Sequence, residues 1–183
     1  MKKADDPRGD EELIAAINAG EAAAFEALYR RYRDWVAGLA FRFTGDYELA
    51  LDVLQETFIY LLQKRPMLRL TARLTTFLYP AVKNLSIAAR RKRRRYAPGG
   101  EGLFDLPARE DPSESAREEL AAVFSTLPEV QREVLLMRFA DDMKIEEIAE
   151  ALEIPTGTVK SRLRNGLKAL RDDPRTKAFF ASE

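Results

Sequence analysis

The residues best suited to binding nucleic acid lie on one face of a helix predicted at residues 157–171. At about 100° per residue, the apolar residues of this segment gather on one side: Val159, Leu163, Leu167 and Leu170. The segment contains five basic residues and no acidic one. Its polar groups suit the base edges and phosphates of a DNA major groove, although a solvated amphipathic helix would show a similar pattern. The predicted DNA-binding residues are Thr158, Lys160, Ser161, Arg162, Arg164, Asn165 and Lys168.

A second candidate for nucleic-acid binding is the helix predicted at 76–95, which ends in an unbroken basic run at residues 90–95. Phe77, Tyr79 and Tyr96 supply aromatic rings nearby. Basic groups can hold a phosphate backbone, while rings or an apolar pocket can receive an unstacked base. Taken singly, Phe77 and Tyr79 are more typical of a core, and the basic run alone would also suit a solvated tail.

The helix predicted at 47–64 has one apolar face and one polar face. The apolar face consists of Leu51, Leu54, Phe58, Leu61 and Leu62, which we expect in the core. The polar face consists of Asp52, Gln55, Glu56, Ile59 and Gln63. An isoleucine among carboxylates and amides suits a protein interface, although single apolar residues also occur on ordinary surfaces.

Catalytic and metal-binding chemistry is poorly represented in this chain. It has neither Cys nor His, which excludes thiolate and imidazole ligands, nucleophiles and bases. The acidic pairs 141–142 and 172–173 are more typical of helix ends and loops than of a metal site. The formal net charge is zero, so basic patches must arise by segregation rather than by excess. We expect a cytoplasmic protein with no enzymatic activity, no cofactor, no metal and no membrane insertion.

Helical spacing of apolar residues predicts the elements that position these groups. In the first part of the chain we expect helices at about 11–18, 21–43, 47–64 and 76–95. Asp10 is expected to cap the first helix, and residues 65–75 are expected to form a loop around Pro66. Pro80 requires that the fourth helix either begin within a few residues of this proline or kink.

Shorter helices are expected at about 116–124, 127–139, 144–152 and 157–171. Thr126 and Glu129 have the spacing of a capping box for the second of these. The last two helices, joined by a tight turn at 153–155, have the order of a helix-turn-helix. Glu153 stands in that turn, where glycine would adopt positive φ at lower cost. With no strand pattern, the predicted fold class is all-α.

The composition between these two groups of helices predicts a linker. Residues 101–119 carry seven acidic and two basic side chains, include Pro107 and Pro112, and lack apolar periodicity. We therefore expect two helical domains, at 1–96 and 116–183, joined by a flexible acidic linker at 97–115.

Several motifs point to a known family. In the second domain they are Leu127-Pro128-Glu129 and the segments 132–139, 145–150 and 154–163; in the first they are Gly45-Asp46, Asp52, the segment 55–58, Phe77-Leu78-Tyr79 and Asn84. In this order, over residues 10–95 and 115–172, the chain resembles bacterial RNA polymerase sigma factors of the extracytoplasmic-function (ECF) group in the sigma-70 family.

The resemblance implies a role for each face. Core RNA polymerase would be bound by Asp52, Gln55, Glu56, Ile59 and Gln63. The −10 element of promoter DNA would be opened and held by the loop at 65–75 and by Lys83, Asn84, Arg90, Arg91, Arg93 and Arg94. The helix at 157–171 would read the −35 element. The resemblance also implies an anti-sigma factor as a partner.

Two other readings remain open on the residues alone. One is a helix-turn-helix regulator that binds an operator as a dimer, which would have no need of the segment 55–58. The other is a helical metal-dependent nuclease, which the lack of His and of convergent carboxylates disfavours.

Overall fold

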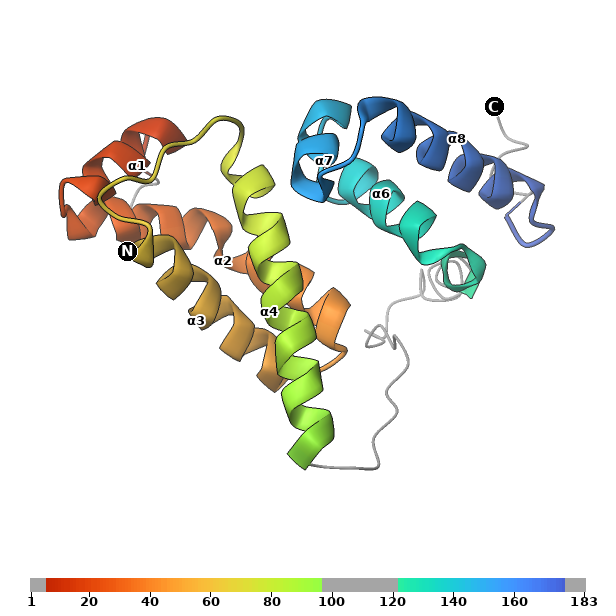
Figure 1. Ribbon diagram of the computed structural model, residues 1–183, viewed down its shortest axis with the longest axis horizontal. Coiled ribbons are helices and arrows are strands. Elements are labelled where there is room, and N and C mark those ends of the chain that lie inside the picture. Colours follow the sequence, from red (N-terminus) through yellow and green to blue (C-terminus); the bar gives the residue numbers. More distant parts are fainter. Residues whose placement is uncertain (1–5, 97–121, 177–183) are drawn as a thin grey trace. The chain divides into compact units, whose positions relative to one another are not determined.

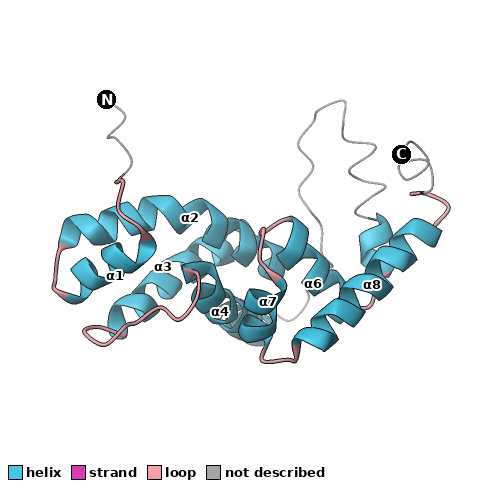
Figure 2. Cartoon of the chain, turned by 90° about the horizontal axis from the view of Figure 1, so that it is seen from above, coloured by secondary structure: helices cyan, strands magenta, loops and turns pink. Residues whose placement is uncertain are grey.

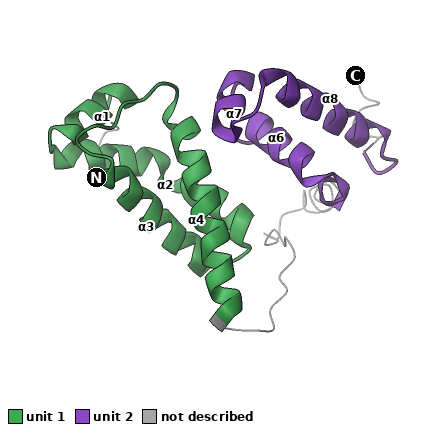
Figure 3. Ribbon diagram, viewed as in Figure 1, with its two compact units in different colours: residues 1–105 green, residues 106–183 purple. Residues whose placement is uncertain are grey.

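The computed structural model describes residues 6–96 and 122–176. The chain divides into two compact units, residues 1–105 and 106–183 (Figure 3). Every regular element of the described residues is a helix (Figure 2), which confirms the all-α prediction. None of the described helices combines the length and the hydropathy needed to cross a bilayer. The predicted linker at 97–115 lies outside the described residues.

Unit 1 is built around a long second helix. Its helices are α1 (Asp10–Asn18), α2 (Ala22–Thr44), α3 (Tyr47–Gln63) and α4 (Leu74–Tyr96). Helix α2 contacts each of the other three, and α3 also packs against α4 (Figure 1). Fully buried leucines fill the spaces between them: Leu13, Leu28, Leu39, Leu61, Leu74 and Leu78. Helical spacing of apolar residues therefore produces a bundle with polar outer faces.

The junction between α2 and α3 is set by two adjacent residues. Gly45 adopts a left-handed conformation with φ of 66°, and its amide donates to the Phe41 carbonyl at 2.8 Å to end α2. Asp46 then caps α3, because its side chain accepts a hydrogen bond from the Leu49 amide at 2.9 Å. This turn brings the end of α2 and the start of α3 together.

Helix α4 begins at Leu74, two residues earlier than predicted, and Pro80 lies inside it. Proline has no amide hydrogen, so one backbone hydrogen bond is missing at this point of the helix. The side chains on either side of Pro80 are well packed, with Leu78, Tyr79 and Val82 all buried. We attribute the tolerance of the proline to this packing.

The start of α1 differs from the prediction. Gly9, not Asp10, precedes the helix, and Glu12 accepts a hydrogen bond from the Gly9 amide at 2.8 Å. The Asp10 carboxylate instead accepts hydrogen bonds from Arg31 and Tyr32 on α2. The capping prediction for Asp10 was wrong, because both of its carboxylate oxygens accept hydrogen bonds from side chains of α2.

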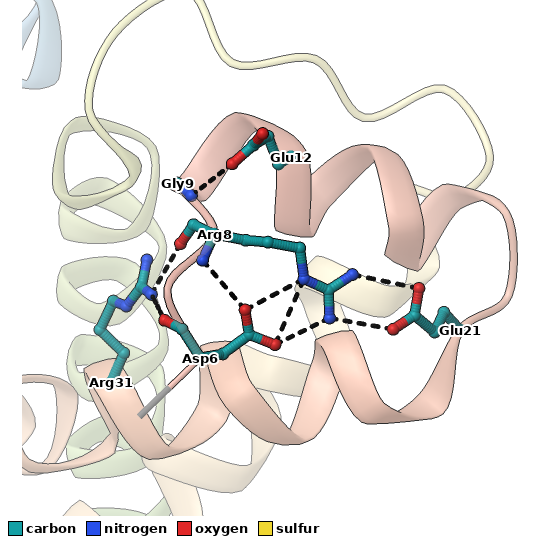
Figure 4. Close-up of polar contacts among 6 residues, drawn as sticks. All are labelled: Asp6, Arg8, Gly9, Glu12, Glu21 and Arg31. Atoms are coloured by element: carbon teal, nitrogen blue, oxygen red, sulfur yellow. Dashed lines mark hydrogen bonds and ion pairs between the residues drawn. The ribbon is translucent and has the colours of Figure 1, made fainter. Parts of the chain in front are cut away.

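Charged side chains hold the segment before α1 in place (Figure 4). Arg8 binds the Asp6 carboxylate at 2.8 Å and the Glu21 carboxylate at 2.9 Å. Hydrogen bonds from the side chain and the amide of Arg8 lower the pKa of Asp6 to about 2. Arg31 donates to the carbonyls of Asp6 and Arg8 at 3.0 and 2.9 Å. These contacts tie residues 6–9 to α2.

Unit 2 contains α6 (Glu129–Phe139), α7 (Ile145–Leu152) and α8 (Thr156–Asp172), preceded by helical residues 122–126. The three labelled helices all contact one another (Figure 1). The predicted capping box at Thr126 was wrong: Pro128 precedes α6, and the Thr126 hydroxyl donates to the Val123 carbonyl at 2.7 Å. Thr126 thus closes the preceding helical turn.

Candidate functional site

The helix-turn-helix forms as the sequence predicted, with a strained residue in its turn. Glu147 accepts a hydrogen bond from the Lys144 amide at 2.7 Å and closes the first turn of α7. Glu153 follows α7 with φ of 54° and ψ of 42°, the left-handed conformation anticipated for this position. The Ile154 amide donates to the Ala149 carbonyl at 3.0 Å across the turn. The turn therefore redirects the chain into α8 within a few residues.

Helix α8 presents most of the predicted DNA-binding residues to solvent. Lys160, Ser161, Arg164, Asn165 and Lys168 are exposed, and Thr158 and Arg162 are half-buried. The Ser161 hydroxyl donates to the Thr158 carbonyl at 2.9 Å, so its lone pairs remain available as acceptors. The polar face of α8 is thus a continuous surface of cationic, amide and hydroxyl groups.

The opposite face of α8 fixes how the helix is seated. Val159, Leu163 and Leu170 are buried as predicted, whereas Leu167 lies at the edge and is 36% exposed. Gly166 is also buried, and a Cβ at this position would lie 2.8 Å from Cδ1 of Leu135 on α6. The backbone of α8 therefore approaches α6 closely at Gly166, which the pattern of apolar side chains does not reveal.

On α3, all five residues predicted to bind polymerase are exposed: Asp52, Gln55, Glu56, Ile59 and Gln63. Ile59 exposes 53% of its surface. Of the five residues predicted as core, Leu54, Phe58 and Leu61 are buried, whereas Leu51 and Leu62 are half-buried. Phe58 packs its ring against Tyr29 at 4.9 Å between centroids. The polar face of α3 is therefore exposed within the described residues of unit 1, while its other face packs against α2 and α4.

The basic run at the end of α4 divides into two groups. Arg90 donates to the Phe43 carbonyl at 3.3 Å, and Arg93 pairs with Asp46. The Leu49 amide and the Arg93 guanidinium hold the pKa of Asp46 below its ordinary value. Asn84, Arg91 and Arg94 are exposed, and Lys83 is half-buried. Two of the six predicted −10 residues therefore bind the junction between α2 and α3.

The aromatic residues near α4 have different environments. Tyr79 is only 2% exposed and packs against Phe43 at 6.0 Å between centroids, as expected of a core residue. Phe77 is half-buried and stacks on Tyr60 of α3 at 5.9 Å. The Lys64 ammonium lies 4.7 Å from the Tyr60 ring centre. We did not anticipate Tyr60 or Lys64, because the stack that joins them to Phe77 is made between two different helices, α3 and α4.

The acidic pairs take part in local contacts. Asp173 accepts hydrogen bonds from the Arg175 side chain and amide, which lower its pKa to about 2. Asp142 lies 3.8 Å from Arg138, and Asp141 is buried. Across residues 6–96 and 122–176, no cluster of acidic side chains has the arrangement of a metal site.

Comparison with known families adds independent information. Residues 28–96 match the family described as Sigma-70 region 2, and residues 117–170 match Sigma-70, region 4. The ECF RNA polymerase sigma factor SigL of Mycobacterium tuberculosis (strain H37Rv) is 32% identical over 164 residues, covering 86% of this chain and 93% of SigL. The ECF RNA polymerase sigma factor SigW of Bacillus subtilis is 29% identical over 173 residues, covering 86% and 92%.

Solved structures support the same fold. CnrH, in complex with the cytosolic domain of CnrY, superposes with a TM-score of 0.66 at 21% identity, covering 95% of this chain and 99% of CnrH. The sigma factor RpoE of Bartonella quintana, in complex with the anti-sigma factor NepR, gives 0.62 at 20% identity, covering 81% and 94%. The helical arrangement described above is thus found in solved structures.

Proposed function

The chain belongs to the ECF group of the sigma-70 family, which directs RNA polymerase to promoters, and we propose how its helices divide that work. Core polymerase is bound by α3, the −10 element by the loop at 64–73 with α4, and the −35 element by α8. The observation that carries this proposal is that each helix exposes most of its predicted polar residues while its apolar face is buried.

The exposed face of α3 fits the polymerase better than it fits DNA. Asp52 and Glu56 would repel phosphates, whereas carboxylates beside an exposed isoleucine suit a protein partner with basic and apolar groups. Ile59 stands near the middle of this face, flanked by Gln55 and Gln63. We therefore place Ile59 at the centre of the polymerase contact.

Contact with the −10 element falls mainly to residues of α4 other than Arg90 and Arg93. Arg90 and Arg93 are bound to Phe43 and Asp46, so they hold the helix end rather than a phosphate. Arg91 and Arg94 are exposed along the same run. We propose that these two arginines, with Lys83 and Asn84 nearer the middle of α4, supply the DNA contacts.

The −35 element is read by the outward face of α8. Arg164 and Asn165 lie near the middle of the helix, where side chains can reach base edges, and both are exposed. Lys160 and Lys168 lie on either side of them and would contact phosphates. Specificity should therefore depend on Arg164 and Asn165 more than on the lysines.

An anti-sigma factor is a further proposed partner. The structures of CnrH and of Bartonella RpoE were both solved as complexes, the second with a protein named as an anti-sigma factor. We propose that such a partner controls this chain by covering the exposed faces of α3 and α8. A pull-down from the native host that recovered only polymerase subunits would contradict this proposal.

The test of the proposed function is open-complex formation by the holoenzyme on promoters with a matched or a scrambled −35 element. Arg164→Ala should reduce open-complex formation on the matched promoter about 5- to 150-fold, since a direct base contact contributes about 1–3 kcal/mol of discrimination. Open-complex formation on the scrambled promoter should stay unchanged. Arg33→Ala removes an equal charge from an exposed position of α2 and serves as the control. Equal losses on both promoters for Arg164→Ala would mean that Arg164 contacts only phosphate.

A further inference from the structure

The loop between α3 and α4 is anchored to α1 by one side chain. The Asn18 amide nitrogen donates to the Leu68 carbonyl at 2.8 Å, across 50 residues of sequence. Only the amide nitrogen can donate to a carbonyl, so this contact determines the orientation of the amide group. The Asn18 side-chain oxygen is buried and makes no hydrogen bond among the described residues. Asn18 thus gains its main polar contact from the loop.

Around this anchor the loop alternates between buried and exposed side chains. Leu68 is 6% exposed, whereas its neighbour Met67 is 84% exposed and Arg69 is also exposed. A buried leucine and a bonded carbonyl at one residue fix both the position and the rotation of the backbone there. The directions of Met67 and Arg69 consequently depend on the tie between Asn18 and Leu68.

We propose that Asn18 is a positioning residue for promoter recognition: through Leu68 it sets how the loop presents Met67 and Arg69 to the −10 element. This inference rests on the proposed role of the loop in binding promoter DNA. Helix α1 lies outside residues 28–96, the segment that matches Sigma-70 region 2. The proposal therefore gives α1 a function in recognition that the matched region does not contain.

Two measurements on the full-length chain test the anchor and its function separately. Asn18→Ala should increase tryptic cleavage after Arg69 severalfold, because the loop loses a tie point and opens more often. In the holoenzyme, the same change should lower the ratio of open complexes on matched and substituted −10 elements about three- to tenfold, with affinity for core polymerase unchanged. Both measurements are repeated with Asn18→Asp, whose side chain has the same size but lacks the amide donor.

The matched control is Glu12→Ala, which removes a hydrogen bond from the opposite end of α1. It should leave both the cleavage after Arg69 and the −10 ratio unchanged, which separates a loss of α1 stability from a loss of the anchor. Unchanged cleavage in both Asn18 variants would overturn the anchor. Faster cleavage with an unchanged −10 ratio would overturn the positioning role. Failure of the proposed function would appear differently, as a lack of −10 discrimination by the unaltered protein.

Discussion

Asp46 combines two interactions whose contributions can be separated by substitution. Its carboxylate caps α3 through the Leu49 amide and pairs with Arg93 of α4. Loss of a helix cap costs about 1 kcal/mol. The Arg93 side chain is 53% exposed, so solvent screening limits the ion pair to about 0.5 kcal/mol. Asp46→Ala should therefore cost about 1.5 kcal/mol, whereas Asp46→Asn, which keeps a capping oxygen, should cost about 0.5 kcal/mol.

The assay is urea unfolding followed by tryptophan fluorescence. Trp35 is the one tryptophan of the chain and lies in α2, so its signal reports on unit 1. In thermal unfolding, a loss of 0.5 kcal/mol corresponds to roughly 2–4 °C for a domain of this size. Arg93→Ala should cost about 0.5 kcal/mol, and the double variant Asp46→Asn with Arg93→Ala no more than either single change.

The same pair has a defined pH dependence. The pKa of Asp46 is held below its ordinary value, so its stabilising effect is complete above the unfolded carboxyl pKa of about 3.9 and is lost as the pH falls through the lower folded pKa. The stability difference between the unaltered chain and Asp46→Asn should therefore shrink below about pH 4. A difference that stays constant below pH 4 would contradict this assignment.

A functional measurement completes the test. Arg91→Ala should reduce the salt dependence of promoter binding by a slope of roughly one, as expected for one lost phosphate contact, and leave thermal stability unchanged. Arg93→Ala should lower thermal stability and leave the salt dependence of promoter binding unchanged. Equal costs for Asp46→Asn and Asp46→Ala would refute the capping argument. Additive costs for Asp46→Asn and Arg93→Ala would refute the pairing, and an equal loss of salt slope for both arginines would mean that Arg93 also contacts DNA.

Two further predictions concern α3 and α8. Ile59→Asp should weaken binding to core polymerase at least tenfold, about 1.4 kcal/mol, without loss of stability. The control Tyr47→Asp, at an exposed position on another side of α3, should have little effect on this affinity. Equal affinities of the two variants, measured by gel filtration or titration, would show that Ile59 is not part of the contact. Gly166→Ala should destabilise unit 2 by about 1 kcal/mol, because the cost of overpacking against Leu135, about 1–3 kcal/mol, exceeds the gain of about 1 kcal/mol in helix propensity. Gly157→Ala, with open space around its Cβ, should instead stabilise α8. Hydrogen exchange of α6 and α8 would measure both effects, and slower exchange in Gly166→Ala would show that Leu135 moves aside freely.

Much of the architecture follows from local patterns in the sequence. The helices of unit 1 and the helix-turn-helix of unit 2 were predicted to within a few residues, because helical periodicity and helix-ending residues are properties of short segments. The outward faces of α3 and α8 were also predictable, since a helix with one apolar side must bury that side. The tight turn expected between the last two helices also identified Glu153 as the residue in the strained turn.

Contacts between distant segments were decided by the tertiary structure. Local spacing placed Arg90 and Arg93 with the other arginines of their run, but their partners Phe43 and Asp46 each lie 47 residues away. Asp10 carries the features of a helix cap, yet its carboxylate binds α2 instead. Periodicity states which side of a helix is apolar but not which groups of another helix come within hydrogen-bonding distance. Those distances depend on how the helices pack, and only the folded chain determines them.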